Sequence, residues 1–184
     1  MKRLLLNILV FSLLVNFLSC MEEQDFDQFD TLRMVPTVTT GLLYFETDEP
    51  SINAIGLPNG IAFYSKTTNF APFENDYVKE RLLGATIVYQ ITNTTSKELG
   101  LNIEFLDDSG IPIHTESFSM EAHPAAAHTR EVAYGPGGLD LNLLMATTRL
   151  RFTALNLGDA STVSSAQDPK LILKSSGEFI FQLQ

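Results

Sequence analysis

A strict alternation of apolar and polar residues in the middle of the chain most constrains the fold. The segment from Leu99 to Phe105 reads LGLNIEF, and its large apolar residues recur at every second position. Because side chains of a β-strand point alternately to the two faces of its sheet, this period of two predicts a strand with one buried face. The turn-forming run Asp107-Asp108-Ser109-Gly110 follows, and Ile111 to Met120 is predicted to return as its antiparallel partner.

Six further segments have the composition of strands, with β-branched and aromatic residues bounded by turn residues. They are Val38 to Phe45, Ile61 to Tyr64, Ala85 to Thr92, Ala125 to Tyr134, Leu150 to Ala154, and the C-terminal stretch from Leu171 to Leu183. About seven short strands separated by turns predict an all-β fold, an immunoglobulin-like antiparallel β-sandwich.

One or two short helices are expected between these strands. Asn69 to Gly84 contains good helix formers, and Gly84 is a suitable C-terminal cap, although Tyr77 to Leu83 also fits a lead into the next strand. Leu139 to Thr147 is apolar, with Asp140 as the expected N-cap of a single helical turn. Residues 48–60 are expected to be turn and loop, because glycine, proline and asparagine interrupt them.

The first nineteen residues have the pattern of a secretory signal. Lys2 and Arg3 precede an apolar run from Leu4 to Leu18. That run is about 15 residues long, whereas a helix needs roughly 20 apolar residues to cross the hydrocarbon core of a bilayer. Bulky Phe17 does not suit an ordinary signal peptidase site, which needs a small residue there.

The residue that follows, Cys20, is the only cysteine in the chain. Ser19 and Cys20 resemble the end of a bacterial lipoprotein box, in which a small residue precedes an obligatory cysteine. The resemblance implies that Cys20 carries a thioether-linked diacylglycerol and further acyl chains such as palmitate, and becomes the mature N-terminus. The alternative is a plain secreted protein with a free Cys20. A lone cysteine also excludes an intrachain disulfide, so the fold must be stabilised by its core.

An acidic tract follows the cysteine, and it contains no basic residue. Residues 21–30 read MEEQDFDQFD, and the acidic residues nearest to Cys20 are Glu22, Glu23, Asp25 and Asp27. Like charges at this density favour an extended, solvated tether. The tract also resembles the export signal of surface lipoproteins of Bacteroidota, which implies a location on the outer face of the outer membrane, exposed at the cell surface. A calcium-binding loop is the other hypothesis for this tract, but the tract lacks the D-x-[DN]-x-[DN]-G spacing of such a loop.

These features divide the chain into a signal peptide (1–19), a lipidated cysteine with an acidic tether (20–36) and a sandwich domain (37–184). Loss of residues 1–19 removes two bases and no acid, so the formal charge of −10 becomes about −12. Such a surface repels phosphate groups, which argues against a nucleic-acid partner.

No catalytic motif is recognisable, and no cofactor is expected. The sequence lacks G-x-S-x-G, H-E-x-x-H, phosphate-binding and dinucleotide fingerprints. His123 and His128 lie five residues apart, which matches no standard zinc spacing, and His114 stands alone, so no metal site is predicted. The aspartates of the 107–110 turn are expected to bond the backbone of that turn.

A group of aromatic residues in loop-rich sequence is the one candidate ligand-binding feature. Its members are Phe63, Tyr64, Phe70, Phe73 and Tyr77. Exposed aromatic rings there would form a platform for a sugar or peptide, whereas buried rings would pack over an open edge of the sandwich.

The leader, the acidic tract and the segments NTTSKELGLNIEFLDDSG and LILKSSGEFIFQL resemble small lipoproteins of Flavobacteria-like bacteria. That resemblance implies the compartment and the fold, and transfers no functional residue beyond Cys20. The leading interpretation is a non-enzymatic, membrane-anchored envelope lipoprotein whose sandwich is a structural or protein-interaction module. A carbohydrate- or peptide-binding module, with a glycan or an envelope protein as partner, is the alternative, and a hydrolase is the third.

Overall fold

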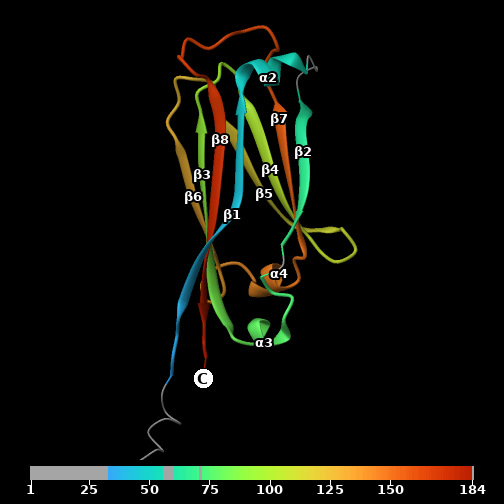
Figure 1. Ribbon diagram of the computed structural model, residues 1–184, viewed down its shortest axis with the longest axis vertical. Helices are drawn as coiled ribbons and strands as arrows, with labels where there is room; N and C mark the ends of the chain where they lie inside the picture. Colours follow the sequence, from blue (N-terminus) through green and yellow to red (C-terminus); the bar gives the residue numbers. More distant parts are fainter. Residues whose placement is uncertain (1–32, 56–59, 71, 184) are drawn as a thin grey trace, which may run out of the picture. The chain divides into compact units, whose positions relative to one another are not determined.

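Strands with one buried face make up most of the chain that this computed structural model describes, which comprises residues 33–55, 60–70 and 72–183. The strands are β1 (Thr37–Asp48), β2 (Ile61–Asn69), β3 (Leu82–Asn93), β4 (Leu99–Leu106), β5 (Pro112–Met120), β6 (His128–Tyr134), β7 (Arg149–Asn156) and β8 (Lys170–Phe181). Three short helices lie in the connections: α2 (Glu49–Ala54), α3 (Asp76–Lys79) and α4 (Leu141–Met145) (Figure 1).

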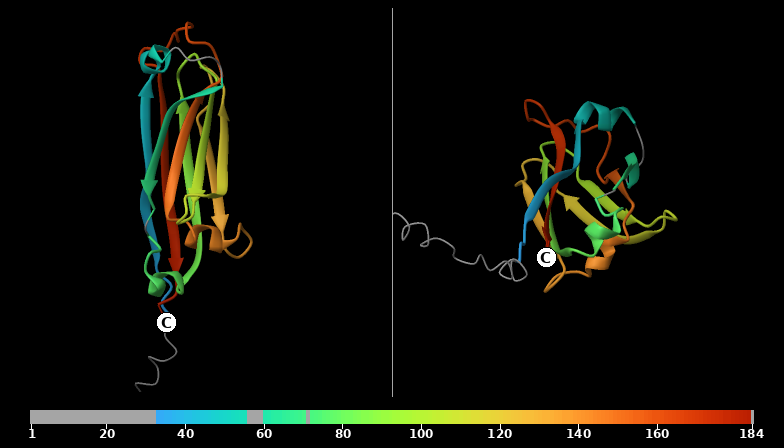
Figure 2. Two further views of the ribbon diagram at one scale, coloured as in Figure 1. Left: turned by 90° about the vertical axis from the view of Figure 1, so that its right-hand side faces the viewer. Right: turned by 60° about the horizontal axis from the view of Figure 1, so that its bottom comes forward.

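The strands form two antiparallel sheets of four, in the orders β1-β8-β3-β6 and β2-β7-β4-β5. Figure 2 shows the two sheets as the two layers of a sandwich. The all-β sandwich predicted from the sequence is therefore confirmed. The expected number of about seven strands is close to the eight that the described residues form, but the immunoglobulin-like order is wrong, because among these eight only the β4–β5 connection joins strands within one sheet. This order is that of a double-sheet jelly roll.

The β4–β5 hairpin has the alternation that the sequence predicted. Leu101 and Ile103 are fully buried, and their register partners on β5 are Phe118 and Glu116. Gly110 supplies a positive φ of 82° at the turn, which a residue with a Cβ atom adopts only at a cost. Buried aliphatic and aromatic side chains from both sheets form one continuous core between the layers.

The helices differ from the prediction in two places. Residues 49–54 form helix α2 rather than loop, because the Asp48 carboxylate accepts a hydrogen bond of 2.8 Å from the backbone N–H of Ser51 and Pro50 suits a first turn. Between β2 and β3, helix α3 is only four residues long. Gly84 caps no helix, since it lies inside β3.

Helix α4 begins as predicted. The Asp140 side chain accepts a hydrogen bond of 3.0 Å from the N–H of Asn142, so Asp140 is its N-cap. The bounds of the strands differ from the expected segments by up to five residues. β2 continues to Asn69, five residues beyond the predicted end, and β6 begins at His128 instead of Ala125.

Helices α2 and α3 lie at opposite ends of the sandwich (Figure 1). At the α3 end, the backbone N–H of Leu183 donates to the carbonyl of Met34 over 2.9 Å, so the segment before β1 and the segment after β8 lie side by side. Within the described chain, no helix is long and apolar enough to cross a membrane.

Candidate binding site

The sandwich has two lateral edges, and they are built differently. At one of them, the guanidinium of Arg130 on β6 donates to the carboxylate of Glu116 on β5 and to the backbone carbonyl of Ser117 over 3.3 Å. The Nε2 atom of His114 lies 2.7 Å from the same carboxylate, whose side chain is only 2% exposed. The Arg130 guanidinium and the His114 imidazole thus both contact the buried Glu116 carboxylate, and the contact with Arg130 joins the two sheets at this edge.

Aromatic packing completes this closed edge. The ring of Phe118 lies 5.2 Å from that of Tyr89 and 5.9 Å from that of His128, centroid to centroid. The Arg130 guanidinium lies 5.1 Å from the Phe118 centroid, within the range of a cation–π interaction. These contacts join inward-facing side chains of β5 and β6 across this edge, while the outward-facing side chains of both strands stay exposed.

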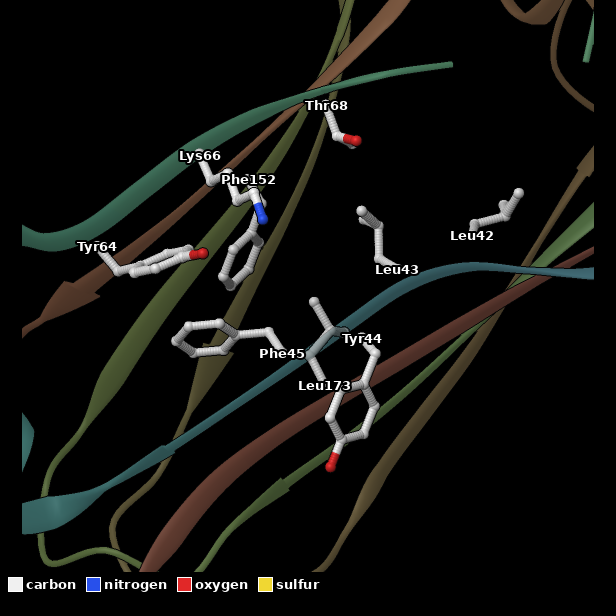
Figure 3. A pocket seen from close by; sticks show the side chains of 9 residues that line it. All are labelled: Leu42, Leu43, Tyr44, Phe45, Tyr64, Lys66, Thr68, Phe152 and Leu173. Carbon is white, nitrogen blue, oxygen red and sulfur yellow. The ribbon is translucent and has the colours of Figure 1, made fainter. Parts of the chain in front are cut away.

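The opposite edge, between β1 and β2, holds a groove. Phe45 on β1 packs against Tyr64 on β2 with 4.5 Å between ring centroids, and against Phe152 on β7 with 4.9 Å. The cavity that these rings border has a volume of about 180 Å³. Its lining is Leu42, Leu43, Tyr44, Phe45, Tyr64, Lys66, Thr68, Phe152 and Leu173 (Figure 3). We refer to it as the β1–β2 groove.

A β-bulge interrupts each of the two strands that border the groove. The register of β1 shifts between Gly41 and Leu43, and that of β2 shifts between Ala62 and Tyr64. Bulges change the direction in which side chains point and disturb the regular hydrogen-bonding edge. Beyond its bulge, β2 places Tyr64 opposite Ala154, a fully buried residue on the inner face of β7.

Lys66 also lies on the inner face of β2. Its register partner is Phe152, which is only 4% exposed and belongs to the core. Figure 3 shows the Lys66 side chain beside the Phe152 ring, whereas Tyr44 points away from the other rings. The Tyr44 hydroxyl donates instead to Glu46 on the outer face of β1. The β1–β2 groove therefore combines an aromatic wall with one ammonium group.

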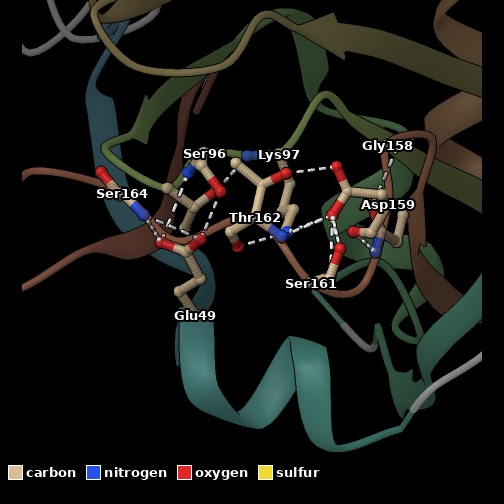
Figure 4. Close-up of polar contacts among 10 residues, drawn as sticks. Glu49, Ser96, Lys97, Gly158, Asp159, Ser161, Thr162 and Ser164 are labelled. Atoms are coloured by element: carbon tan, nitrogen blue, oxygen red, sulfur yellow. Dashed lines mark hydrogen bonds and ion pairs between the residues drawn. The ribbon is translucent and has the colours of Figure 1, made fainter.

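A second polar cluster lies at the α2 end of the sandwich (Figure 4). The Glu49 side chain is buried and accepts hydrogen bonds from the backbone N–H groups of Ser96 and Ser164, over 3.3 Å and 3.2 Å. The Ser96 hydroxyl donates to it as well. These bonds tie helix α2 to two loops.

Lys97 extends the same cluster. Its side chain is fully buried, and its Nζ atom donates to Asp159 over 3.2 Å and to the carbonyl of Thr162 over 2.6 Å. The hydroxyl and N–H of Thr162 and the N–H of Ser161 also bond Asp159, and together with Lys97 they hold the pKa of this carboxyl far below its usual range. Every polar group here has a partner, so the cluster stabilises the 157–169 loop and offers no open ligand position.

The aromatic residues predicted as a platform are divided among three environments. Phe70 and Phe73 are buried, and Phe73 packs on Phe179 with 5.4 Å between centroids, as expected for a satellite of the core. Tyr64 is half-buried in the β1–β2 groove, whereas Tyr77 is 56% exposed at the α3 end, under the Arg81 guanidinium. Phe63 is half-buried at the β2 bulge. The five residues do not form one platform.

Sequence reasoning missed most of the groove. Phe45 was only part of a predicted strand, and Phe152 was only part of another. Lys66 received no role. No sequence signal marked it, because the predicted strand ended at Tyr64 and Lys66 is an exposed lysine, which is the usual state of that residue type. Finding it required the β2 register, which the bulge shifts by one residue.

The remaining candidate residues have local structural roles or lie outside the described chain. Among the described residues, no three histidine, cysteine or acidic side chains are grouped closely enough to hold a metal ion. Asp107 accepts a hydrogen bond of 2.8 Å from the N–H of Ile111, which confirms the expected backbone bond for that aspartate, whereas the Asp108 carboxylate accepts from the Ser109 hydroxyl over 3.2 Å. Cys20 and the acidic residues Glu22, Glu23, Asp25 and Asp27 all lie outside the described residues.

Comparisons with known proteins give no family and no close relative. No family model matches the chain, and no curated protein matches it. Among solved structures, the protein of an infectious bursal virus T=1 particle has 11% sequence identity to this chain and a TM-score of 0.39. The match covers 82% of this chain and 32% of the viral chain, so this chain spans about a third of that protein. The family 11 carbohydrate-binding module of the Clostridium thermocellum cellulase Lic26A-Cel5E has 12% sequence identity and a TM-score of 0.35, and the match covers 82% of this chain and 85% of that module. Latent PorU from Porphyromonas gingivalis has 17% sequence identity and a TM-score of 0.32, and the match covers 82% of this chain and 13% of PorU. At such scores, these likenesses carry no argument about function.

Proposed function

We propose that this chain is an outer-membrane lipoprotein, held in the bilayer through Cys20, whose β-sandwich is a non-catalytic interaction module. In this proposal the β1–β2 groove is the surface that binds the partner, either an envelope protein or a glycan. The observation that carries the proposal is the difference between the two edges of the sandwich. Polar bonds cover one edge, whereas the other has an aromatic-lined groove.

The lining of the groove supports binding. Recognition sites are typically concave, with apolar and aromatic walls and a few placed polar groups. Phe45, Tyr64 and Phe152 supply the wall, and Lys66 and Thr68 supply polar groups on the inner face of β2. Because aromatic side chains lose little conformational entropy on binding, they are suited to form the centre of such a contact.

The carboxylates are placed for structure rather than for hydrolysis. Glu116 is engaged by Arg130, and Glu49 by backbone and hydroxyl donors. Asp76 and Glu80 border an open hollow of about 710 Å³ between α3 and α4, but both side chains are exposed and not enclosed in a cleft. This arrangement favours the interaction module over the hydrolase.

A photo-crosslinking experiment in intact cells tests the binding surface. A benzophenone amino acid replaces Tyr64 in the groove, and in a matched variant it replaces Tyr77, an exposed tyrosine outside the groove. We expect a discrete adduct from position 64 and none of the same size from position 77. Equal adducts from both positions, or none from position 64, would contradict the proposed surface.

Fractionation tests the anchor separately. We expect Cys20→Ala to release the protein from the membrane or to leave an uncleaved precursor, because the acyl chains attach at that sulfur. Three acyl chains at about 0.8 kcal/mol per buried CH₂ form a stable anchor, and the acidic tract adds no attraction to anionic lipid. A Cys20→Ala protein that matures normally and stays in the membrane fraction would disprove the anchor.

A further inference from the structure

We infer that the β1–β2 groove binds a small organic acid, with its apolar ring or short chain against Phe45, Tyr64 and Phe152 and its carboxylate on Lys66. The inference goes beyond the proposed function, because a small organic acid is a different occupant of the same groove from the protein or glycan proposed above. It goes further in assigning Lys66 as the residue that selects an anionic ligand.

The position of Lys66 is the first argument. On β7, the residues opposite β2 with inward side chains are Leu150, Phe152 and Ala154, and none of them is more than 4% exposed. Lys66 faces Phe152 directly, so its ammonium group lies at the mouth of an apolar wall. The Lys66 side chain itself is exposed, so its ammonium group reaches solvent at this open edge and is accessible to an anion.

The missing counter-ion is the second argument. Four other basic side chains have acidic partners: Lys97 has Asp159, Arg130 has Glu116, Arg151 has Glu104 and Lys170 has Glu46. Lys79 and Lys174 have no ion pair among the described residues either, but neither of them lines the β1–β2 groove. Within the part of the chain that the structure describes, Lys66 has no ion pair and no hydrogen bond to a side chain. In a protein with a formal charge of −10, a cation left without a carboxylate is available to a ligand.

The size of the groove is the third argument. A cavity of about 150 Å³ is large enough for benzene. The β1–β2 groove, at about 180 Å³, therefore suits one ring or a short chain with a small substituent. Three rings within 6 Å of one another, Phe45, Tyr64 and Phe152, provide the apolar surface for it.

The bulges favour a small acid over a peptide strand. An extended peptide binds a sheet edge through a regular row of backbone hydrogen bonds. The register shifts at Gly41/Leu43 and at Ala62/Tyr64 break that row on both strands that border the groove. Recognition at this edge therefore depends on side chains, and Lys66 is the charged one among them.

Binding of four probes tests the inference on the full chain in nanodiscs of neutral phosphatidylcholine. Phenylacetate carries both ring and charge, phenylacetamide lacks the charge, acetate lacks the ring, and galacturonate replaces the apolar ring with a sugar. We expect phenylacetate to bind about fivefold more tightly than phenylacetamide, as for a partly exposed ion pair, and more tightly than acetate and galacturonate. Equal Kd values for phenylacetate and phenylacetamide would overturn the role of the charge, and tighter binding of galacturonate would overturn the apolar part.

Variants assign the preference to Lys66. Lys66→Met should abolish the preference for phenylacetate over phenylacetamide, and Lys66→Arg should retain it. Lys174→Met is the matched control, because Lys174 is exposed on the outer face of β8. A preference that survives in Lys66→Met, or that Lys174→Met abolishes, would overturn the assignment. If the Tyr64 adduct forms in cells but no probe prefers the acid, the interaction module stands and this inference fails.

Discussion

The rings of Phe45 and Tyr64 lie 4.5 Å apart, although their strands belong to different sheets and share no backbone ladder. This pair spans the edge of the sandwich at the β1–β2 groove. At the other edge, Arg130 and Glu116 make the corresponding connection through an ion pair. One edge is thus joined by charge and the other by apolar packing, and that difference underlies the proposed binding surface.

The first prediction concerns the closed edge. Arg130→Ala should destabilise the fold by about 2 kcal/mol, because it leaves the buried Glu116 carboxylate without its cation. Urea unfolding of Arg130→Ala, of Glu116→Gln and of the double variant measures the coupling between the two residues. We expect the double variant to be less destabilised than the sum of the single ones. A single Arg130→Ala effect within about 0.5 kcal/mol of zero would show that the edge is not held in this way.

The second prediction separates the wall of the groove from the core beneath it. Phe152→Ala should cost about 3–5 kcal/mol of the free energy of unfolding, because that side chain is buried between the sheets. Tyr64→Ala should cost clearly less, since Tyr64 is half-exposed at the groove. Denaturant midpoints of the two variants provide the comparison, and equal losses would mean that Tyr64 is a core residue.

The third prediction concerns the loop at the α2 end. Asp159→Ala should loosen residues 157–169, because it removes the carboxylate that Lys97, Ser161 and Thr162 all bond. Hydrogen exchange of the loop amides measures this effect, with Asp168→Ala as a control, since Asp168 is 71% exposed and pairs only with Lys170. Faster exchange confined to the Asp159 variant is the expected result, and unchanged exchange would argue against this role.

The fourth prediction is a loss of stability in alkali. Burial raises the pKa of Tyr89 and that of Tyr134 well above the usual value near 10. The folded state therefore holds these protons more tightly than the unfolded state does. Their contribution to stability is complete below pH of about 10 and is lost as the pH rises through the higher folded-state pKa.

Thermal unfolding between pH 9 and 11 checks this behaviour. Tyr89→Phe should reduce the fall in Tm above pH of about 10, because phenylalanine has no proton to lose. At neutral pH it should change the free energy of unfolding by less than about 1 kcal/mol, since the Tyr89 hydroxyl has no hydrogen-bond partner among the described residues. An unaltered alkaline transition in Tyr89→Phe would contradict the predicted role of burial.

The sequence predicted the parts of the fold that depend on local pattern. The alternation from Leu99 to Phe105 correctly identified a strand with one buried face, and Asp140 correctly marked the start of α4. These features depend on neighbours within a few residues. Helix α2 was missed, although Asp48 and Pro50 are a recognisable N-cap and first-turn pair, because the glycines and Pro58 that follow dominated the interpretation of that segment.

Strand partners and the groove are set by long-range contacts, which no local pattern contains. A period of two shows which face of a strand is buried but not which strand lies beside it. The order β1-β8-β3-β6 joins the first and last of the described strands, and no sequence feature near either strand indicates that pairing. The groove depends on the same pairing and on two bulges, so Phe45, Lys66 and Phe152 were not recognised as one site.

A map of NMR chemical-shift changes in the full chain on addition of phenylacetate tests most directly whether this groove is the binding surface. We predict that the largest changes occur at Leu43, Phe45, Tyr64, Lys66 and Phe152, the residues that border the β1–β2 groove. Glu116 and Arg130 at the closed edge should not change. Largest changes at the closed edge or around Glu49 at the α2 end would contradict the account.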